Sequence, residues 1–277
     1  MSAEFVLGPK AVRAGYELRY LKSTPSTNSH ALDFSIEALS RAGKHEGPPP
    51  GIWFVADRQT MGRGRQGRSW FWQEGNLAAS LLLILPSTVR APQILSFVAA
   101  NALADAVEPF LGGNGEELRL KWPNDLLLSG GKLAGILLEA RTMGNGRRAV
   151  ALGFGLNVKS APENISYPVA SLAGFGCDAE RHSLFKSLGE SWHENYCLWN
   201  HGNGTARVLS RWRKRAHGLG SPVRIEGSGK AAEGIFLDID GDGHLILLQN
   251  DGQRTLVASG DVSFYDADWP GDIFDKG

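Results

Sequence analysis

The spacing of hydrophobic and polar residues changes several times along the chain, and each change marks an expected element. A Ser/Thr/Asn cluster at 23–28 precedes apolar residues spaced as on one helix face, which predicts a helix that ends before the Gly/Pro break at 45–51. A second amphipathic helix is predicted at 91–111, with Pro92 in its first turn. Two further helices are predicted near 182–200 and 205–216.

Short apolar runs between these helices predict strands at 52–56, 77–85, 118–122 and 126–128. The segments 132–140 and 149–158, joined by an Asn145-Gly146 turn, predict a long β-hairpin. One side of its second strand carries only small residues: Ala151, Gly153, Gly155 and Asn157. Such a face favours either the close approach of a flat group or a helix packed tightly on the sheet, and the strand alone does not decide between them.

The pattern changes to short strands after Ser221. Four are predicted, at 222–226, 231–239, 244–249 and 254–258, with Gly/Asp turns between them. We therefore expect an α+β domain at 1–218 followed by a small β-barrel domain at 219–277. Within the barrel, "DIDGDG" at 238–243 imitates a calcium loop, but flanking strands favour a hairpin turn.

Charge and composition narrow the class of protein. The 277 residues contain 29 Lys plus Arg and 29 Asp plus Glu, so a broad basic face for nucleic acid is not expected. Cys177 and Cys197 form no Cys-x-x-Cys motif, which excludes a disulfide framework and a zinc ribbon. The first ten residues lack a signal-peptide layout, and the apolar run 77–86 is shorter than the ~20 residues of a membrane span. A cytoplasmic protein without a membrane segment is expected.

The segment "TMGRGRQGRSW" at 60–70 fits two phosphate-binding patterns, G-x-G-x-x-G and a P-loop with Arg in place of Lys. Both patterns require a helix after the glycines, whereas the residues that follow run into a strand. We therefore reject both. Three arginines among three glycines then indicate either a solvated surface turn or a flexible anion-binding loop, in which glycine lets the backbone approach a ligand and guanidinium groups pair with its charge.

Five segments, in this order, resemble one enzyme family. They are "STN" at 26–28, "RQTMGRGRQGRSW" at 58–70, "GNLAASLLL" at 75–83, "KWPNDLLLSGGKLAGILLE" at 121–139 and "GFGLNV" at 153–158. Together they are similar to the biotin protein ligases, the biotin–[acetyl-CoA-carboxylase] ligases of bacteria. The resemblance implies a mixed-sheet biotin/lipoate ligase-type catalytic domain with a C-terminal SH3-like β-barrel. Met61 departs from the small residue usual in the family.

The resemblance also implies the chemistry and its residues. Such enzymes join biotin to ATP as biotinoyl-5'-AMP and transfer biotin to a lysine of a biotin carboxyl carrier domain. The implied catalytic residues are Arg65, Lys132, Asp125 and Lys121. The implied biotin-binding residues are Ser26, Thr27, Asn28, Gln59, Gly62, Arg63, Gly64, Arg65, Lys132 and Gly135. The implied ATP and adenylate residues are Arg63, Arg65, Arg68, Trp70, Lys121, Asn124, Lys132 and Asn157. Magnesium is implied by ATP chemistry, and no metal-ligand cluster is expected.

Three alternatives stay open at this stage. Lipoate–protein ligases share the fold but resemble one another in an "RRxSGGG"-type loop, which "GRGRQGR" replaces here. A non-catalytic biotin-binding or regulatory protein would keep the fold without the chemistry. A repressor needs a DNA-binding module longer than the stretch before Ser26, so we expect a monofunctional ligase without sequence-specific DNA binding. An exposed edge strand would allow a homodimer.

Overall fold

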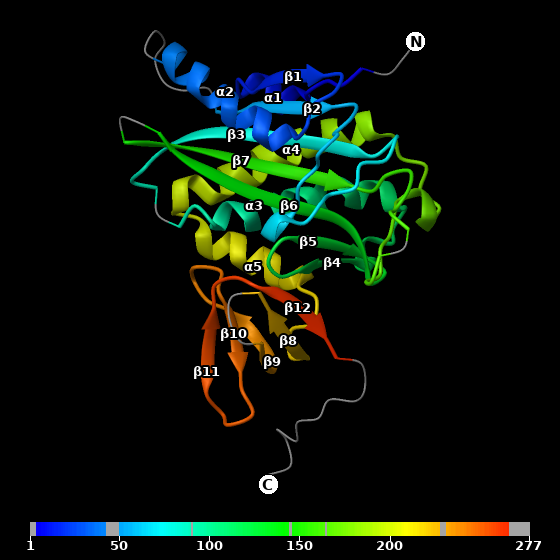
Figure 1. Ribbon diagram of the computed structural model, residues 1–277, viewed down its shortest axis with the longest axis vertical. Helices are drawn as coiled ribbons and strands as arrows, with labels where there is room; N and C mark the ends of the chain where they lie inside the picture. The colour runs from blue at the N-terminus through cyan, green and yellow to red at the C-terminus, as the bar shows by residue number, and fades with distance from the viewer. Residues whose placement is uncertain are drawn as a thin grey trace.

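The computed structural model describes residues 4–42, 50–89, 91–143, 146–163, 165–227 and 231–265 (Figure 1). Its helices are α1 (Pro9–Arg13), α2 (Thr27–Ala42), α3 (Ile94–Val107), α4 (Arg181–Trp199) and α5 (Thr205–Arg215). Its strands are β1 (Glu17–Leu21), β2 (Ile52–Ala56), β3 (Leu77–Pro86), β4 (Leu118–Lys121), β5 (Asp125–Leu128), β6 (Gly131–Met143), β7 (Arg147–Leu156), β8 (Pro222–Glu226), β9 (Ala232–Ile239), β10 (Leu245–Leu248), β11 (Arg254–Val257) and β12 (Asp261–Phe264).

The larger sheet has the strand order β1-β2-β3-β7-β6-β5-β4. Strands β1 and β2 are parallel, and every other neighbouring pair in it is antiparallel. The sheet is therefore mixed, and the predicted α+β class is confirmed. The predicted hairpin is present as β6 and β7, paired from Ala134 with Leu156 to Met143 with Arg147. Its predicted turn residue Asn145 lies outside the described residues, as does most of the expected break at 45–51.

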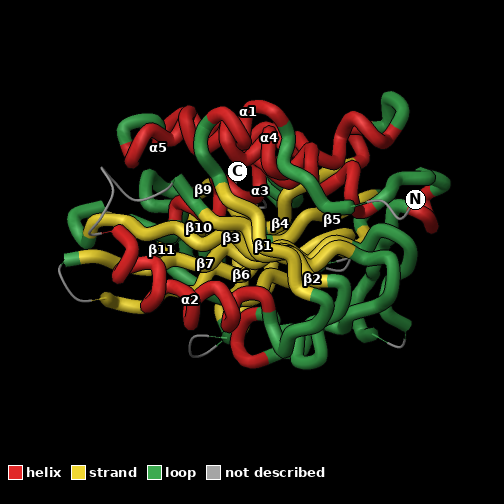
Figure 2. The backbone as a smooth tube through the Cα atoms, turned by 90° about the horizontal axis from the view of Figure 1, so that it is seen from above, coloured by secondary structure: helices red, strands yellow, loops and turns green. Residues whose placement is uncertain are grey.

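Helices cover both faces of this sheet (Figure 2). On one face, α3, α4 and α5 enclose the main core, into which Val150, Leu152 and Phe154 of β7 point. On the opposite face, α2 places Ala31 and Leu32 against a second cluster that includes Ala149 and Ala151. The small side of β7 thus accepts a helix along its first half.

Helix α3 is the most deeply buried of the described helices, with 12 buried residues. The segment Ile94–Leu111 has the length and mean hydropathy, 1.4, of a membrane span, but 72% of it is buried inside the fold. Core packing therefore accounts for its apolar composition. The sequence run 77–86, by comparison, forms the interior strand β3 of the larger sheet.

The C-terminal strands form a second, antiparallel sheet in the order β11-β10-β9-β8-β12. It is joined to the larger sheet near the site: the indole Nε1 of Trp122 donates to the carbonyl of Gly243 at 3.0 Å. The "DIDGDG" segment is the turn between β9 and β10, as predicted. The sequence patterns missed three short elements, α1, β1 and β12, each of which buries at most one residue.

The glycine/arginine segment lies between β2 and β3. It contains only the single 3₁₀ turn Arg65–Gly67, and no helix follows it before β3. The rejection of both phosphate-loop patterns is therefore confirmed. We call residues 60–70 the ligand loop. It is closed by an isolated bridge between Arg63 and Ser69, and the N–H of Trp70 donates to the carbonyl of Gly62 at 2.9 Å.

Candidate active site

Two paired glycines form a flat floor on the α2 side of the larger sheet. Gly135 of β6 lies directly opposite Gly155 of β7. A Cβ atom on Gly155 would lie 2.4 Å from Cε2 of Trp70, and one on Gly135 would lie 3.2 Å from Cζ3 of the same ring. Only glycine allows this contact. The flat group expected against the small side of β7 is, in this structure, the indole of Trp70.

Lys132 and Asp125 form an ion pair beside this floor. The Lys132 Nζ lies 2.8 Å from Asp125 Oδ1, and the two side chains are 20% and 18% exposed. The ammonium also lies 5.8 Å from the ring centres of Trp70 and Tyr167. Strand pairing brings the two residues together, since Asp125 begins β5 opposite Gly135 and Lys132 follows the β5–β6 turn. The sequence-predicted pair of functional residues therefore shares one site.

Arg65 and Arg68 connect the ligand loop to the C-terminal sheet. Arg65 Nη1 donates to Asn124 Oδ1 and to the carbonyl of Gly260, each at 3.2 Å. Arg68 Nη2 lies 2.8 Å from Asp261 Oδ1, which is also 3.9 Å from Arg65 Nη1. Arg65 is the more enclosed of the two arginines, with a side chain 19% exposed against 53% for Arg68. The loop therefore holds two cations that are partly neutralised by Asp261, and one of them, Arg65, contacts Asn124 next to Asp125.

A buried group of hydroxyls and amides lies under the start of α2. The N–H of Thr27 donates to Gln59 Oε1 at 2.8 Å, and Thr27 Oγ1 lies 3.1 Å from the same oxygen. Ser80 Oγ lies 2.7 Å from Thr27 Oγ1 and 2.6 Å from Asn28 Oδ1. These groups present hydrogen-bonding atoms without net charge. Ser80, which is fully buried, was not among the residues predicted from the sequence.

Arg63 also contacts a residue that the sequence did not single out. Its Nη2 lies 2.8 Å and 3.0 Å from the two carboxylate oxygens of Glu139. The Asn28 Nδ2 donates to Glu139 Oε2 at 2.9 Å. Glu139 lies inside the quoted 121–139 block, but β-strand alternation alone gave no reason to prefer it. Glu139 lies on the same face as the glycine floor, because Gly135, Leu137 and Glu139 are two residues apart along β6 and side chains at that spacing point to one face of a sheet.

The other predicted residues have more local roles in this structure. Ser26 precedes α2, where its carbonyl accepts from the N–H of His30 at 3.0 Å. The amide of Asn157 donates to the carbonyl of Ala170 at 3.1 Å and to that of Lys132 at 3.4 Å, so its side chain holds the backbone beside Lys132. Gly62 and Gly64 belong to the bridge that closes the ligand loop; a Cβ on Gly62 would lie 2.5 Å from the Trp70 carbonyl oxygen. Met61 is 70% exposed.

Lys121 ends β4, next to the site. Its Nζ lies 5.8 Å from the ring centre of Phe264 in the C-terminal sheet. Burial lowers the pKa of Lys121 below its usual value, and the Lys132 charge lowers it further, while the Asp125 carboxylate opposes this shift. Trp122 and Pro123, joined by a cis peptide bond, form the predicted turn between β4 and β5. Lys121 is thus a partly desolvated cation that loses its proton at a lower pH than a surface lysine.

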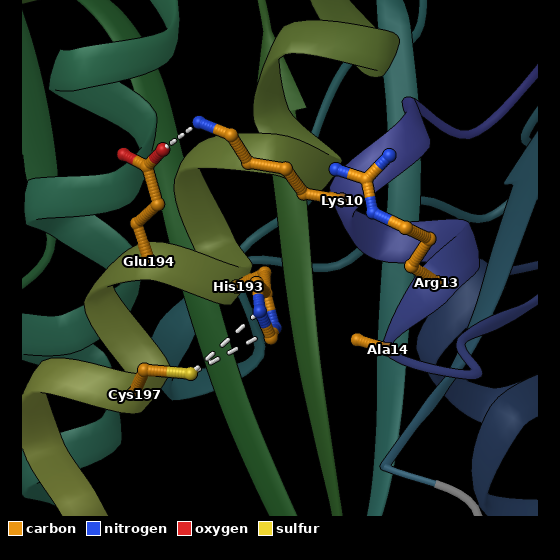
Figure 3. Close-up of a pocket in the computed structure, with 6 residues that line it drawn as sticks. All are labelled: Lys10, Arg13, Ala14, His193, Glu194 and Cys197. Atoms are coloured by element: carbon orange, nitrogen blue, oxygen red, sulfur yellow. Dashed lines mark hydrogen bonds and ion pairs between the residues drawn. The ribbon is translucent and has the colours of Figure 1, made fainter.

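A cavity of about 630 Å³ lies elsewhere. It is open to solvent and lies between α1 and α4, where Lys10, Arg13, His193 and Cys197 line it (Figure 3). The side-chain cluster in the described part of the chain that could hold a metal ion, Asp240, Asp242 and His244, is in the β9–β10 turn. Neither feature includes a residue predicted from the sequence. The candidate site is recognised by its converging charged side chains.

Comparisons with known proteins agree with this geometry. The profile of the Biotin/lipoate A/B protein ligase family matches residues 20–157, and that of the Biotin protein ligase C terminal domain matches residues 218–265. The biotin–[acetyl-CoA-carboxylase] ligase of Paracoccus denitrificans is 36% identical over 86% of this chain and 97% of its own length. That of Mycobacterium tuberculosis is 34% identical over 92% of this chain and 93% of its own.

A solved structure gives the same result. The biotin protein ligase from Aquifex aeolicus in complex with biotin and ATP superposes with a TM-score of 0.70, at 26% identity over 90% of this chain and 98% of that one. None of these similarities favours lipoate transfer or a non-catalytic role. The predicted family, fold class and activity are therefore confirmed, and the chain belongs to the biotin protein ligases.

Proposed function

We propose that the chain joins the carboxylate of biotin to the α-phosphorus of ATP on the Gly135–Gly155 floor and then passes the biotinoyl group to a carrier lysine. The observation that carries this assignment is that Arg65, Lys132 and Lys121 all lie close to the Asp125 carboxylate, near a buried group of uncharged hydroxyls and amides. In the first step a carboxylate oxygen attacks the α-phosphorus and pyrophosphate leaves. In the second step the amine attacks the acyl carbon and AMP leaves.

The uncharged hydroxyl and amide groups under the start of α2 would bind the ureido ring of biotin. That ring both donates and accepts hydrogen bonds, which matches the hydroxyl and amide groups of Thr27, Asn28 and Gln59. The side chain of Ser26 caps α2 weakly, since its Oγ lies 3.5 Å from the N–H of Ser29. We therefore assign Ser26 a role through its position at the helix start. Gly62 and Gly64 would let the loop backbone reach the ligand.

The cationic side chains of the site would act where the negative charges of biotin and ATP are brought together. Biotin carboxylate and the ATP α-phosphate repel each other, and Arg65 and Lys132 would neutralise both and the charge that develops between them. Lys121 would face the leaving pyrophosphate. Asn124, held by Arg65, would fix the triphosphate, and Arg63 and Arg68 would close the ligand loop over the adenylate. Trp70 would pack against the adenylate. Asn157 would stabilise the backbone next to the floor.

Asp125 is proposed as the base of the second step. Its carboxylate lies at the floor edge and can accept the proton that the carrier lysine must lose before it attacks. The neighbouring Lys132 would hold the phosphate as AMP leaves. Both residues act on reacting atoms, so we count them with Arg65 and Lys121 as catalytic.

Magnesium is proposed to arrive with ATP. Asp125 and Asp261, two carboxylates near the site, are paired with Lys132 and with Arg68 respectively. These side chains do not form a ready oxygen-ligand site for a metal, and Mg²⁺ commonly binds through substrate phosphates with few protein ligands. The triphosphate would therefore supply most of its coordination, with Asn124 nearby.

The partner and setting are proposed from the family. The acceptor would be the biotin carboxyl carrier domain of acetyl-CoA carboxylase or of another biotin-dependent carboxylase, modified in the cytoplasm. No sequence-specific DNA binding is expected, which a gel shift with the gene's own promoter would test. A homodimer through the sheet edge β1 or β4 stays a prediction, which sedimentation would test.

We place the boundary between the catalytic and C-terminal domains at 218/219, between α5 and β8.

The direct test is transfer to a carrier. The protein would be mixed with ATP, magnesium, biotin and a purified carrier domain, and the mass of the carrier measured. We expect one biotinoyl group on one lysine, dependent on ATP. No mass gain with folded protein and folded carrier would refute the proposed transfer.

A further inference from the structure

One carboxylate connects two parts of the site that are distant in sequence. Glu139 on β6 accepts from Arg63 of the ligand loop through both oxygens, at 2.8 Å and 3.0 Å. Its Oε2 also accepts from Asn28 Nδ2, at the start of α2, at 2.9 Å. The Glu139 side chain is 28% exposed, so these contacts are partly shielded from water. Charge-assisted hydrogen bonds of this kind are the strong ones.

These contacts determine which way the Asn28 amide points. The two protons of Asn28 Nδ2 go to the carbonyl of Leu137 at 3.1 Å and to Glu139 Oε2. Both of those atoms can only accept, so the amide nitrogen must face β6 and the amide oxygen must face Ser80, 2.6 Å away. The Ser80 hydroxyl therefore donates its single proton to Asn28. Without the Glu139 charge, one of the two constraints on the amide is lost.

The sheet leaves the amide little freedom in position. A Cβ atom on Gly153 would lie 2.6 Å from Asn28 Oδ1. Gly153 is opposite Leu137, and Ala151 is opposite Glu139, so Asn28 rests on the floor face one step away from the Glu139 carboxylate. The remaining freedom of the side chain is rotation of the amide, which exchanges a donor for an acceptor.

We propose that Glu139 is a positioning residue for biotin recognition: its single carboxylate fixes the orientation of the Asn28 amide and holds Arg63 of the ligand loop against the same pocket. This role rests on the proposed function. Glu139 touches none of the reacting atoms and acts through Asn28 and Arg63. Recognition of the ring and placement of the loop therefore depend on one residue.

The substitution Glu139→Gln separates charge from shape. The amide that replaces the carboxylate has one acceptor oxygen and one NH₂ group. If the oxygen accepts from Asn28, the NH₂ faces the Arg63 guanidinium, donor against donor; if it accepts from Arg63, the NH₂ faces Asn28 Nδ2. Oε2 accepts from both Asn28 and Arg63 and Oε1 accepts from Arg63 alone, so in either orientation at least one of these three hydrogen bonds becomes a donor against a donor, and the negative charge that strengthens all three is lost. A site built to hydrogen-bond its ligand discriminates strongly when such a group is misplaced.

The experiment is biotin-dependent pyrophosphate exchange into ATP, with wild type, Glu139→Gln and a matched control. The control is Asp33→Asn, because Asp33 pairs with Arg141 at 3.0 Å and so links the same helix and strand two residues further along β6. Asp33 is 74% exposed and contacts neither Asn28 nor Arg63 in the described structure. Thermal melts of all three proteins confirm folding.

We expect Glu139→Gln to raise the KM for biotin about tenfold or more, the loss associated with a charged hydrogen bond. The kcat at saturating biotin should stay within about twofold of wild type, because Glu139 is proposed to touch none of the reacting atoms. Asp33→Asn should match wild type. Glu139→Gln should raise the KM for biotin less in the Asn28→Ala background than in wild type, since part of its effect passes through Asn28 and the rest through Arg63.

Each other outcome has a definite meaning. Glu139→Gln with an unchanged KM for biotin, or with additive effects in the double variant, would overturn the positioning role. A lower kcat at unchanged KM would also overturn it, in favour of a direct part in the chemistry. A wild-type protein without biotin-dependent exchange would instead refute the proposed function, and the two failures are therefore distinct.

Discussion

The ammonium of Lys132 lies 2.8 Å from the carboxylate of Asp125, at the edge of the floor formed by Gly135 and Gly155. The register of β5, β6 and β7 sets this arrangement: Asp125 is opposite Gly135, which is opposite Gly155. The proposed phosphate-binding cation and the proposed base are thus held on adjacent strands.

Replacing Asp125 should separate those half-reactions. Asp125→Asn keeps the shape but removes the base, so transfer to the carrier should fall by about a hundredfold or more, within the usual range for general-base catalysis. Adenylation, measured as pyrophosphate exchange, should fall much less. The ratio of the two rates serves as its own control against misfolding. An equal loss in both half-reactions would contradict the assignment.

Lys121 should give ATP binding a pH dependence. Burial lowers the pKa of Lys121 from its usual value, so the group loses its charge at a lower pH than an ordinary lysine, whose pKa is about 10.4. The KM for ATP should therefore rise as pH increases toward that value. Lys121→Arg, which keeps its charge throughout, should not show this rise. Identical pH profiles for the two proteins would exclude Lys121 as the titrating group.

Arg65 should retain the adenylate. Arg65→Ala removes a cation from the ligand loop and should speed the release of preformed biotinoyl-5'-AMP about tenfold or more, the effect of losing a charged hydrogen bond. The fold should stay intact. Arg58→Ala, which removes an exposed arginine just before the loop, is the matched control. Tight retention of labelled adenylate by Arg65→Ala would rule out this role.

The glycine floor should be sensitive to one methyl group. Gly155→Ala would place Cβ 2.4 Å from Cε2 of Trp70, so the ring must move and the free energy of unfolding should fall by about 1–3 kcal/mol. Gly241→Ala is the control, because a Cβ there meets nothing within 4 Å. Adding Trp70→Ala to Gly155→Ala should recover most of the specific loss. A loss that persists in the double variant would place the clash elsewhere.

The sequence predicted the parts of this site that strand periodicity controls. The alternation along β7 correctly separated a core side, with Val150 and Leu152, from a small side, with Gly153 and Gly155. It did not say what covers the small side. Helix α2 covers one half and Trp70 the other, so both alternatives left open by the sequence apply.

Contacts between distant segments were beyond the sequence. Glu139 and Ser80 became visible only through the pairing register that brings them to Asn28 from two different strands. Asp261 meets Arg68 across 193 residues of chain, and it lies on β12, a strand too short to show a pattern. The cation positions were predicted because the ligand-loop and 121–139 motifs resemble the family. Asp125, which pairs with Lys132, was predicted with them, whereas Glu139 and Asp261, which pair with Arg63 and Arg68, were not.

The measurement that tests the central claim most directly is pyrophosphate exchange into ATP, run with biotin, with lipoate and with neither, at physiological magnesium. We predict exchange that requires biotin and is absent in the other two reactions. Exchange with lipoate instead, or no exchange by folded protein with either acid, would contradict the assignment of this site to biotin activation.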